Sequence, residues 1–234
     1  MRTTSFAFPT ISDAPRSPSR AMRSRSNSTE LVIFGAGGHA KVIVDTCRAS
    51  GVWNPLACLG ESRWSDVGGV PVESQSSASG WLERGVSCAV IAIGNNQIRQ
   101  RVGEEALRAG FQLITVVSPF ACVSQTAVLE PGTVVLAGAV IQVDAIVGAM
   151  SIVNTGASVD HECRLGRAVH VAPHATLCGN VTIGDRVWIG AGSTVIEGIQ
   201  IADDVFVAAG AAIVSNVSAS GARVGGVPAK QLSV

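Results

Sequence analysis

The sequence is poor in aromatic residues: they make up 4% of its 234 residues and include no tyrosine, whereas hydrophobic residues of all kinds make up 47%. Such a composition suits an interior too narrow for rings. No apolar run approaches the length of a membrane span. The formal net charge is zero, and nothing in the charge pattern suggests a nucleic-acid partner. We therefore expect neither a membrane nor a nucleic acid as partner.

Paired cysteine spacings are also missing. The six cysteines are scattered, mostly in apolar surroundings, and they show no metal-site spacing. We interpret them as reduced thiols, which predicts a cytoplasmic protein.

A repeat of six residues fills the chain from Val123 to Val217. An aliphatic residue returns at every sixth position sixteen times, from Val123 to Ile213, and a small or aliphatic residue follows each one four positions later. Corner-forming residues are frequent between them, and the chain has 26 glycines. An amphipathic helix would repeat at three and four residues, so the period excludes a helix. The pattern is that of a hexapeptide repeat.

Hexapeptide repeats predict a triangular coil in which each repeat forms one flat face and points its aliphatic residue inward. Three faces close one coil, and coils stack at the spacing of parallel strands, about 4.8 Å. We expect a β-helix of about five coils over residues 119–218. Residues 219–234 include the glycine and proline turn Val224–Lys230 and should fold back as a cap, because a stack of coils needs its open end covered.

The first 28 residues are rich in serine, arginine and proline and show little periodicity. They predict a disordered arm, since they cannot bury enough surface to become ordered. An arginine- and serine-rich transit peptide is an alternative, although Pro9, Pro15 and Pro18 would interrupt an amphipathic helix. Translation beginning at Met22 is a third possibility.

Residues 29–118 alternate between strand and helix patterns, which predicts a small parallel sheet with helices packed on it, a Rossmann-like α/β domain. The expected strands are 31–34, 56–59, 88–93 and 113–117, and the expected helices are 40–47, 81–84 and 97–110.

A glycine-rich turn, Gly35–His39, joins the first expected strand to the first helix. Strand, glycine turn and helix form the usual cradle for a phosphate. The GxG is present, but Ala40 stands where the dinucleotide motif GxGxxG has its third glycine, so nucleotide binding and a tight turn both remain open. The turns at 60–62 and 94–97 also follow strands and should converge with it on one crevice.

Four motifs together carry a family resemblance, and they are Phe34–Lys41, Ile91–Arg99, Asn154–Thr155 with Asp160–Cys163, and Gly226–Lys230. Residues 31–234 resemble the hexapeptide-repeat acetyltransferases of nucleotide-linked amino sugars: the bacillosamine and perosamine N-acetyltransferases and the related sialic acid O-acetyltransferases. The resemblance implies a left-handed parallel β-helix, acetyl-CoA as co-substrate, and a homotrimer with active sites between adjacent prisms.

The histidines of the coil are the candidate catalytic groups. His161, His170 and His174 all avoid the inward position, so we expect them on the surface or in a groove, and solvated histidines are the alternative. Direct acyl transfer needs a base near neutral pH, and an adjacent carboxylate raises imidazole basicity. The resemblance implies that His161 is the base and Glu162 its support. Asn154, expected near the same groove, would orient the substrate or an oxyanion.

The resemblance also implies the binding residues. For acetyl-CoA they are His170, Ala191, Ala209 and Lys230, with Arg223 as a further contact for the CoA phosphates; His174 has no matching role. For the sugar nucleotide they are Gly37, Gly38 and His39 at the diphosphate, with Gly60, Glu61, Gly94 and Gln97 closing the pocket. Relatives often have paired acids after the second strand, where this chain has Gly60-Glu61-Ser62, so recognition of the base stays open.

A metal site is another possible role for the coil histidines. The related γ-class carbonic anhydrases bind zinc through three histidines across a subunit interface, and zinc needs three converging ligands and an open position. The coil histidines here are nine and four residues apart and do not match that pattern, so we expect no metal.

The predicted activity is acetyl-CoA-dependent N-acetylation of a UDP-, GDP- or dTDP-linked 4-amino sugar for surface glycan synthesis. O-acetylation of a sialic acid or similar sugar by the same machinery is the first alternative. A catalytically idle scaffold that binds sugar nucleotides is the second.

Overall fold

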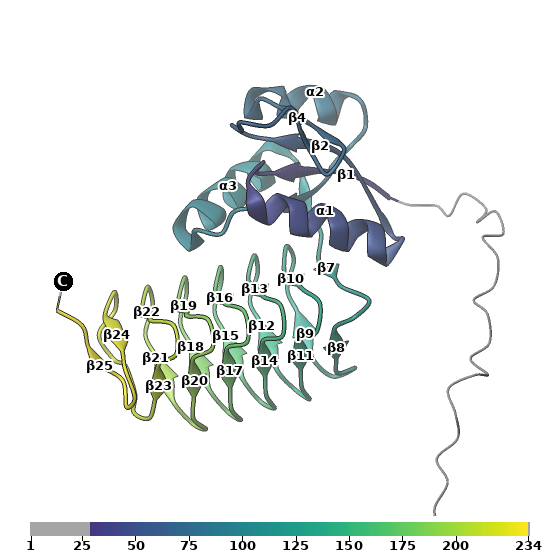
Figure 1. The fold of residues 1–234 in the computed structure, drawn as a ribbon. Coiled ribbons are helices and arrows are strands. Elements are labelled where there is room, and N and C mark those ends of the chain that lie inside the picture. Colours follow the sequence, from purple (N-terminus) through teal and green to yellow (C-terminus); the bar gives the residue numbers. More distant parts are fainter. Residues whose placement is uncertain (1–28, 234) are drawn as a thin grey trace, which may run out of the picture.

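The computed structural model describes residues 29–233. An N-terminal α/β domain sits on one side of a long coil, as Figure 1 shows. The domain holds a six-stranded sheet in the order β3-β4-β2-β1-β5-β6. All its pairs are parallel except β3 with β4. Its elements are β1 (Thr29–Phe34), α1 (Gly38–Ser50), β2 (Trp53–Leu59), β3 (Asp66–Val67), β4 (Val70–Glu73), η1 (Gln75–Ser77), α2 (Ala78–Glu83), β5 (Cys88–Ile91), α3 (Asn96–Ala109) and β6 (Gln112–Leu113).

Local sequence explains the ends of the two long helices. Helix α1 stops at Gly51, which adopts the left-handed conformation that glycine allows. Helix α3 begins after Asn95, whose side chain accepts a hydrogen bond from the Ile98 amide, and ends at Gly110 with φ 108°. The central strand β1 is buried from Leu31 to Phe34 because layers cover both of its faces.

From β7 to β23 the coil consists of two-residue parallel strands arranged in three sheets, and β24 and β25 extend one of these sheets. Strands three apart in order pair with each other, for example β10 with β13, so each coil contributes one strand to each face. The strands are β7 (Val116–Val117), β8 (Cys122–Val123), β9 (Val128–Leu129), β10 (Val134–Val135), β11 (Val140–Ile141), β12 (Ile146–Val147), β13 (Ile152–Val153), β14 (Ser158–Val159), β15 (Arg164–Leu165), β16 (His170–Val171), β17 (Thr176–Leu177), β18 (Thr182–Ile183), β19 (Trp188–Ile189), β20 (Thr194–Val195), β21 (Gln200–Ile201), β22 (Phe206–Val207), β23 (Ala212–Ile213), β24 (Arg223–Gly225) and β25 (Lys230–Gln231).

The inward positions of the repeat form the core of this coil. Of the sixteen aliphatic residues, all but Val123 and Leu129 are buried, and those two lie in the first coil, which has no coil beneath it. The prediction of which residues face inward is therefore confirmed. Strand β24 adds to the sheet of β22, and β25 pairs with β24 in the antiparallel sense, so the tail folds back on the last coils as expected.

A left-handed backbone conformation recurs at every sixth residue from 132 to 210 and makes the corners. Six of these positions are glycine, which adopts positive φ without strain. The others carry side chains at φ between 53° and 60°, and they are Asp144, Met150, Glu162, Ala168, His174, Asn180, Arg186 and Asp204.

The α/β domain is packed on the coil face made by β7, β10, β13 and β16. Outward-facing Val116, Val134 and Ile152 are buried in the same cluster as the apolar side of α1. Met150 and Ala168, at the neighbouring corner, are buried with residues of α3. Helices α1 and α3 pack on opposite faces of the sheet, and Figure 1 shows both on the side of the domain that is next to the coil.

The predicted α/β domain followed by a parallel β-helix is confirmed, with one strand misassigned. The expected strand 113–117 is two strands: β6 closes the domain sheet, and β7 pairs with β10 in the coil. Pairing decides this break, because Val116 lies opposite Val134 one coil later. Strands β3 and β4 were not predicted. Within residues 29–233, no helix is both long and apolar enough to cross a bilayer.

Candidate active site

His161 lies at the coil corner between β14 and β15. Its side chain is 52% exposed, and its Nδ1 lies 3.1 Å from Oε2 of Glu162. The carboxylate can only accept, so Nδ1 carries the proton and donates it, which leaves the Nε2 lone pair free. The His161 amide also donates to Asp160 Oδ1 at 2.8 Å. The corner thus presents an imidazole whose Nδ1 is held by a carboxylate, which is the arrangement of a supported general base.

Glycine at position 179 makes room for the His161 ring. A Cβ built at Gly179 would lie 2.5 Å from both Cε1 and Nε2 of His161, closer than atoms in real structures approach. Gly179 has an ordinary φ, so its backbone does not require glycine. The two residues are one coil apart, and the Asn180 amide donates to the His161 carbonyl at 2.8 Å.

Substitution of Gly179 by alanine should displace the His161 ring while leaving the coil intact. The ring is an exposed side chain and can swing away, so we expect kcat to fall about tenfold or more with a thermal midpoint within about 2 °C of the wild-type value. Steady-state kinetics and a thermal melt measure the two quantities. Unchanged kcat would show that the ring position seen here does not matter for turnover.

Asn154 lies at a different corner from His161. It follows β13, and β14 separates the two residues. Its Nδ2 lies 3.0 Å from His170 Nε2, and its Oδ1 accepts from the Thr155 amide at 2.8 Å. Within one chain, therefore, the structure does not bring Asn154 and His161 into the common groove that the sequence suggested.

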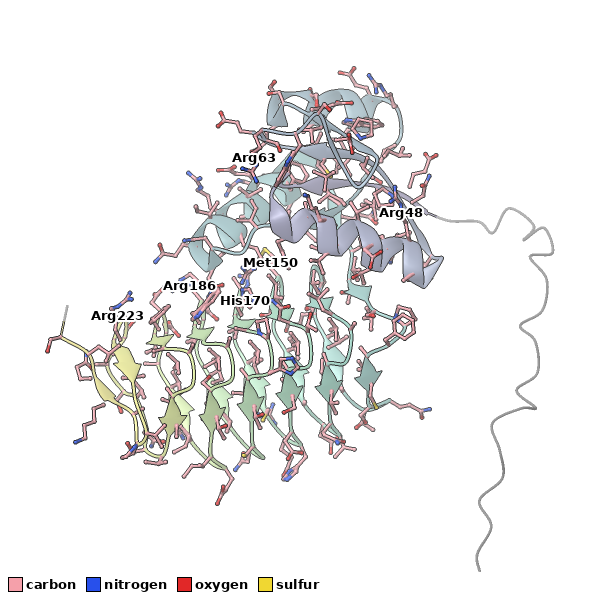
Figure 2. All side chains as sticks on the ribbon, viewed as in Figure 1. Arg48, Arg63, Met150, His170, Arg186 and Arg223 are labelled. Atoms are coloured by element: carbon pink, nitrogen blue, oxygen red, sulfur yellow. The ribbon has the colours of Figure 1, made fainter. Side chains whose placement is uncertain are left out.

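His170 is buried, with 4% of its surface exposed, so the expectation that it lies on the surface or in a groove is wrong. The repeat correctly excludes it from the coil interior, but its outward face is covered by the α/β domain, as Figure 2 illustrates. Burial, and then the charge of Arg99, lowers the His170 pKa to about 3. The imidazole is neutral at physiological pH, and so low a pKa makes it a weak base. His174 is exposed, as predicted.

A cavity of about 430 Å³ lies at the carboxyl ends of β1, β2 and β5. The converging crevice predicted from the turns is therefore present, with one exception: Gln97 does not line it. Six of the seven predicted substrate-binding residues line it together, and they are Gly37, Gly38, His39, Gly60, Glu61 and Gly94.

The glycines of the cradle face open space. A Cβ at Gly37 or Gly38 would meet no protein atom within 4 Å, and α1 has no side-chain cap at its N-terminus. The packing of the chain therefore does not demand glycine at either place, and free N–H groups with the positive helix dipole point into the cavity. This is the arrangement that accepts a phosphate.

His39 differs from the glycines because it is largely buried. Its Nε2 has no hydrogen-bond partner among the described residues, and its ring centroid lies 6.4 Å from that of His170. Burial, and then the charge of Arg99, lowers the His39 pKa to about 4. A ligand here would meet a neutral imidazole rather than a cation.

Gln97 lines a separate cleft of about 360 Å³, on the other side of the turn after β5. Its position in the first turn of α3 directs it toward the coil rather than toward the sheet edge. Trp188 and Phe206 are stacked there with ring planes 9° apart, and the guanidinium of Arg223 lies 4.3 Å from the Phe206 ring centre. Arg186 holds Asp204 with two hydrogen bonds of 2.8 Å at the rim.

The residues predicted to bind acetyl-CoA fall into two sets. Ala191 and Ala209 are exposed on successive coils at one corner, where the Gly210 amide donates to the Ala191 carbonyl at 2.9 Å. Lys230 is exposed on β25 beside a cleft of about 230 Å³. The buried His170 stands apart from both. No cluster of three or more possible metal ligands occurs in residues 29–233.

Several residues at these sites escaped the sequence reasoning. Gln75 and Arg101 line the cavity, and Gly179 underlies His161. The repeat could have identified Gly179, since it stands eighteen positions after His161 and one coil contains eighteen residues. Arg101 carries no comparable signal, because only the packing of α3 brings it to the sheet edge.

Comparisons with known proteins match both parts of the chain. Residues 30–106 match the model of the PglD N-terminal domain, and residues 180–215 match the bacterial transferase hexapeptide model. GDP-perosamine N-acetyltransferase from Caulobacter crescentus, solved with CoA and GDP-perosamine as a histidine-to-alanine variant, has a TM-score of 0.84 at 37% identity, covering 91% of this chain and 100% of that one. The acetyltransferase domain of PglB from Neisseria gonorrhoeae has a TM-score of 0.84 at 36% identity, covering 88% and 100%.

A curated relative matches over a shorter stretch. UDP-N-acetylbacillosamine N-acetyltransferase from Bacillus subtilis is 34% identical over 110 residues, which is 46% of this chain and 51% of that protein. The match therefore spans about half the length of this relative.

Fold and site define a class, the hexapeptide-repeat transferases with a left-handed parallel β-helix, and the predicted fold class is confirmed. Within that class, the chain belongs to the family of sugar-nucleotide N-acetyltransferases that carry a PglD-type N-terminal domain.

Proposed function

We propose that the protein transfers the acetyl group of acetyl-CoA to the amine of a nucleotide-linked amino sugar. The observation that carries this proposal is the His161–Glu162 pair, in which a carboxylate holds Nδ1 of an exposed imidazole at a coil corner. The solved relatives support the substrate class, since the Caulobacter enzyme was solved with CoA and GDP-perosamine, and the Neisseria domain with acetyl coenzyme A.

In the proposed reaction the sugar amine attacks the thioester carbonyl. His161 Nε2 takes the proton that the amine loses, and Glu162 stabilises the resulting imidazolium. Collapse of the tetrahedral intermediate breaks the carbon–sulfur bond, and the proton passes from His161 to the CoA thiolate. The products are the acetamido sugar nucleotide and CoA, with no net change in protonation of the protein.

The acceptor would bind in the cavity at the sheet edge. We assign its diphosphate to the N-terminus of α1, where Gly37 and Gly38 leave the backbone accessible. His39 lines the same cavity and would face the ligand as a neutral imidazole. Gly60, Glu61 and Gly94 line the same cavity, and Arg101 adds a positive charge at its wall.

For acetyl-CoA we propose the exposed corner of Ala191 and Ala209 for the pantetheine arm, with contacts mainly to the backbone. Lys230 would meet the CoA phosphates. His170 and Gln97, also predicted to bind ligands, remain predictions, since one is buried and the other lines a different cleft. The cytoplasmic location likewise stays a prediction.

A thiol-release assay with acetyl-CoA tests the activity across UDP-, GDP- and dTDP-linked 4-amino sugars. We expect CoA release with at least one of them and an acetamido product by mass spectrometry. Acetylation of free or CMP-linked sialic acid alone would favour the O-acetyltransferase instead. Absence of release with every acceptor, in protein that still binds sugar nucleotides, would favour a scaffold.

We propose a homotrimer, and the placement of the proposed catalytic groups supports an assembly of more than one chain. His161 and Asn154 occupy successive corners of one prism, so a shared site requires the corner of one chain to face the neighbouring corner of another. Light scattering on the purified protein should therefore give a mass near three times 23.9 kDa.

Mixed trimers test whether two chains share each site. His161→Ala and Asn154→Ala subunits should each be nearly inactive alone. After unfolding and refolding as an equal mixture, about a quarter of the interfaces would pair an intact His161 with an intact Asn154 from its neighbour, so about a quarter of the wild-type activity should return. The single variants refolded alone serve as controls. No recovery in a mixture that forms trimers would place both groups in one chain's site.

A further inference from the structure

Arg99 is the most buried charged residue in the described part of the chain, with 1% of its surface exposed. It forms no ion pair within residues 29–233. Its guanidinium instead donates to oxygens of the turn after β5, of the first residue of α3 and of two successive coils, and these are Met150 O (2.7 Å), Ile93 O (2.9 Å), Gly94 O (2.9 Å), Asn96 Oδ1 (2.7 Å), Ala168 O (2.7 Å) and Val169 O (3.2 Å).

A buried cation without a counter-ion is costly, and apolar residues would hold a helix on a coil at least as well. The hydrogen bonds of Arg99 therefore suggest a role beyond holding α3 on the coil. They connect the wall of the acceptor cavity at Gly94 with coil corners on two successive turns, at Met150 and Ala168.

The next link runs from Gly94 to His170. Nδ1 of His170 lies 3.4 Å from the Gly94 carbonyl oxygen, which Arg99 also contacts. A carbonyl only accepts, so Nδ1 carries the proton in this neutral imidazole, and Nε2 is left as an acceptor. His39 and Arg99 are the other titratable groups around this ring, and both favour its neutral form.

The last link fixes Asn154. Because His170 Nε2 accepts, the Asn154 atom 3.0 Å away is the amide nitrogen, and Oδ1 is turned to the Thr155 amide at 2.8 Å. Both contacts agree on one orientation of the side chain. One N–H of Asn154 remains free for a substrate oxygen at the corner where Thr155 is exposed.

We infer that Arg99 is a positioning residue for acetyl transfer: through the Gly94 carbonyl it sets the His170 tautomer, and through His170 it orients the Asn154 amide toward the reacting carbonyl. The inference rests on the proposed function. It makes the turn after β5, which lines the acceptor cavity, and the coil corner that bears Asn154 parts of one chain of hydrogen bonds. It also gives His170 a task that requires burial.

The first test is a double-mutant cycle on the full-length protein. Arg99→Met should lower kcat about 10- to 100-fold and leave the KM for acetyl-CoA within about twofold. In an Asn154→Ala background the same change should cost less than about threefold, because the group it positions is gone. Arg108→Met, an exposed arginine of the same helix, is the matched control and should resemble wild type. If the losses of kcat in the two single variants multiply in the double variant, the inference is wrong and Arg99 has only a structural role.

The second test determines the tautomer of His170 directly. ¹⁵N chemical shifts of histidine-labelled protein should show a protonated Nδ1 and an unprotonated Nε2 for His170, and Arg99→Lys should shift this signature. This measurement needs no turnover, so it separates failure of the inference from failure of the proposed function, which would appear as an inactive wild type. A protonated Nε2 in the wild type would refute the chain of hydrogen bonds.

If Arg99→Met does not fold, two His170 variants test the same chain of hydrogen bonds. Glutamine can donate to the Gly94 carbonyl and accept from Asn154, whereas leucine can do neither. His170→Gln should therefore retain at least about tenfold more kcat than His170→Leu. Equal losses of kcat in the two variants would contradict the hydrogen-bonded link from Gly94 through His170 to Asn154.

Discussion

Replacement of His161 by alanine is expected to lower kcat by about 10²- to 10⁴-fold, the range that a positioned general base contributes. The reason lies in the geometry of the corner, where Nδ1 faces Glu162 and Nε2 is free to take a proton. The side chain is 52% exposed and makes no apolar core contact, so its loss should leave the fold and CoA binding unchanged. Steady-state kinetics with a thiol probe measure kcat, and calorimetric titration with CoA measures CoA binding.

His174→Ala is the matched control for this experiment. His174 is another exposed coil histidine, and its ring also lies over a glycine, Gly156, in the preceding coil. It should keep near-normal kcat. Glu162→Gln should cost a few-fold to about tenfold, since the carboxylate is 63% exposed and solvent screens its charge. Near-normal turnover in His161→Ala would remove His161 from the mechanism.

Replacement of Gly190 by alanine should give a large loss of stability. Gly190 is buried with an ordinary φ, and a Cβ there would lie 2.5 Å from the Ala208 carbonyl carbon and the Val207 carbonyl oxygen. These are backbone atoms of the next coil and cannot rotate away. Forcing stacked coils apart should cost about 3 kcal/mol or more, and so lower the thermal midpoint by roughly 6–12 °C in a calorimetric scan.

Gly179→Ala is the natural comparison for Gly190→Ala. Both glycines have ordinary φ and both would gain a Cβ at 2.5 Å from its nearest atom, but at Gly179 the obstacle is the His161 ring. The first substitution should therefore affect turnover and the second stability. If both lowered the midpoint equally, the ring of His161 would be held as firmly as the backbone, contrary to its exposure.

The regular part of the molecule could be predicted because its structure is local and periodic. Every sixth residue faces inward, and three positions after it comes a left-handed corner, so one coil defines the next. The positions of His161 and Glu162 on a corner follow from the same period. The glycine-rich turn after β1 was predictable for a similar reason, since strand, turn and helix are adjacent in the chain.

The period carries no information about what packs against the outside of the coil. It placed His170 away from the interior, but whether that outward residue meets solvent or protein depends on where the α/β domain sits. Two other outcomes also lie outside the period: pairing of β7 with β10 divides the strand expected at 113–117, and Gln97, in the first turn of α3, lines a different cleft.

By itself, then, the sequence determined the β-helix, the inward set of residues, the phosphate cradle and the open corner that bears His161, because each depends on neighbours within a few residues or one repeat. Only the tertiary structure decided that His170 is buried, that Arg99 joins the turn after β5 to the coil, and that Asn154 and His161 lie at different corners. Those features depend on contacts between residues as many as 76 positions apart, as for His170 and Gly94, and no local pattern records such a contact.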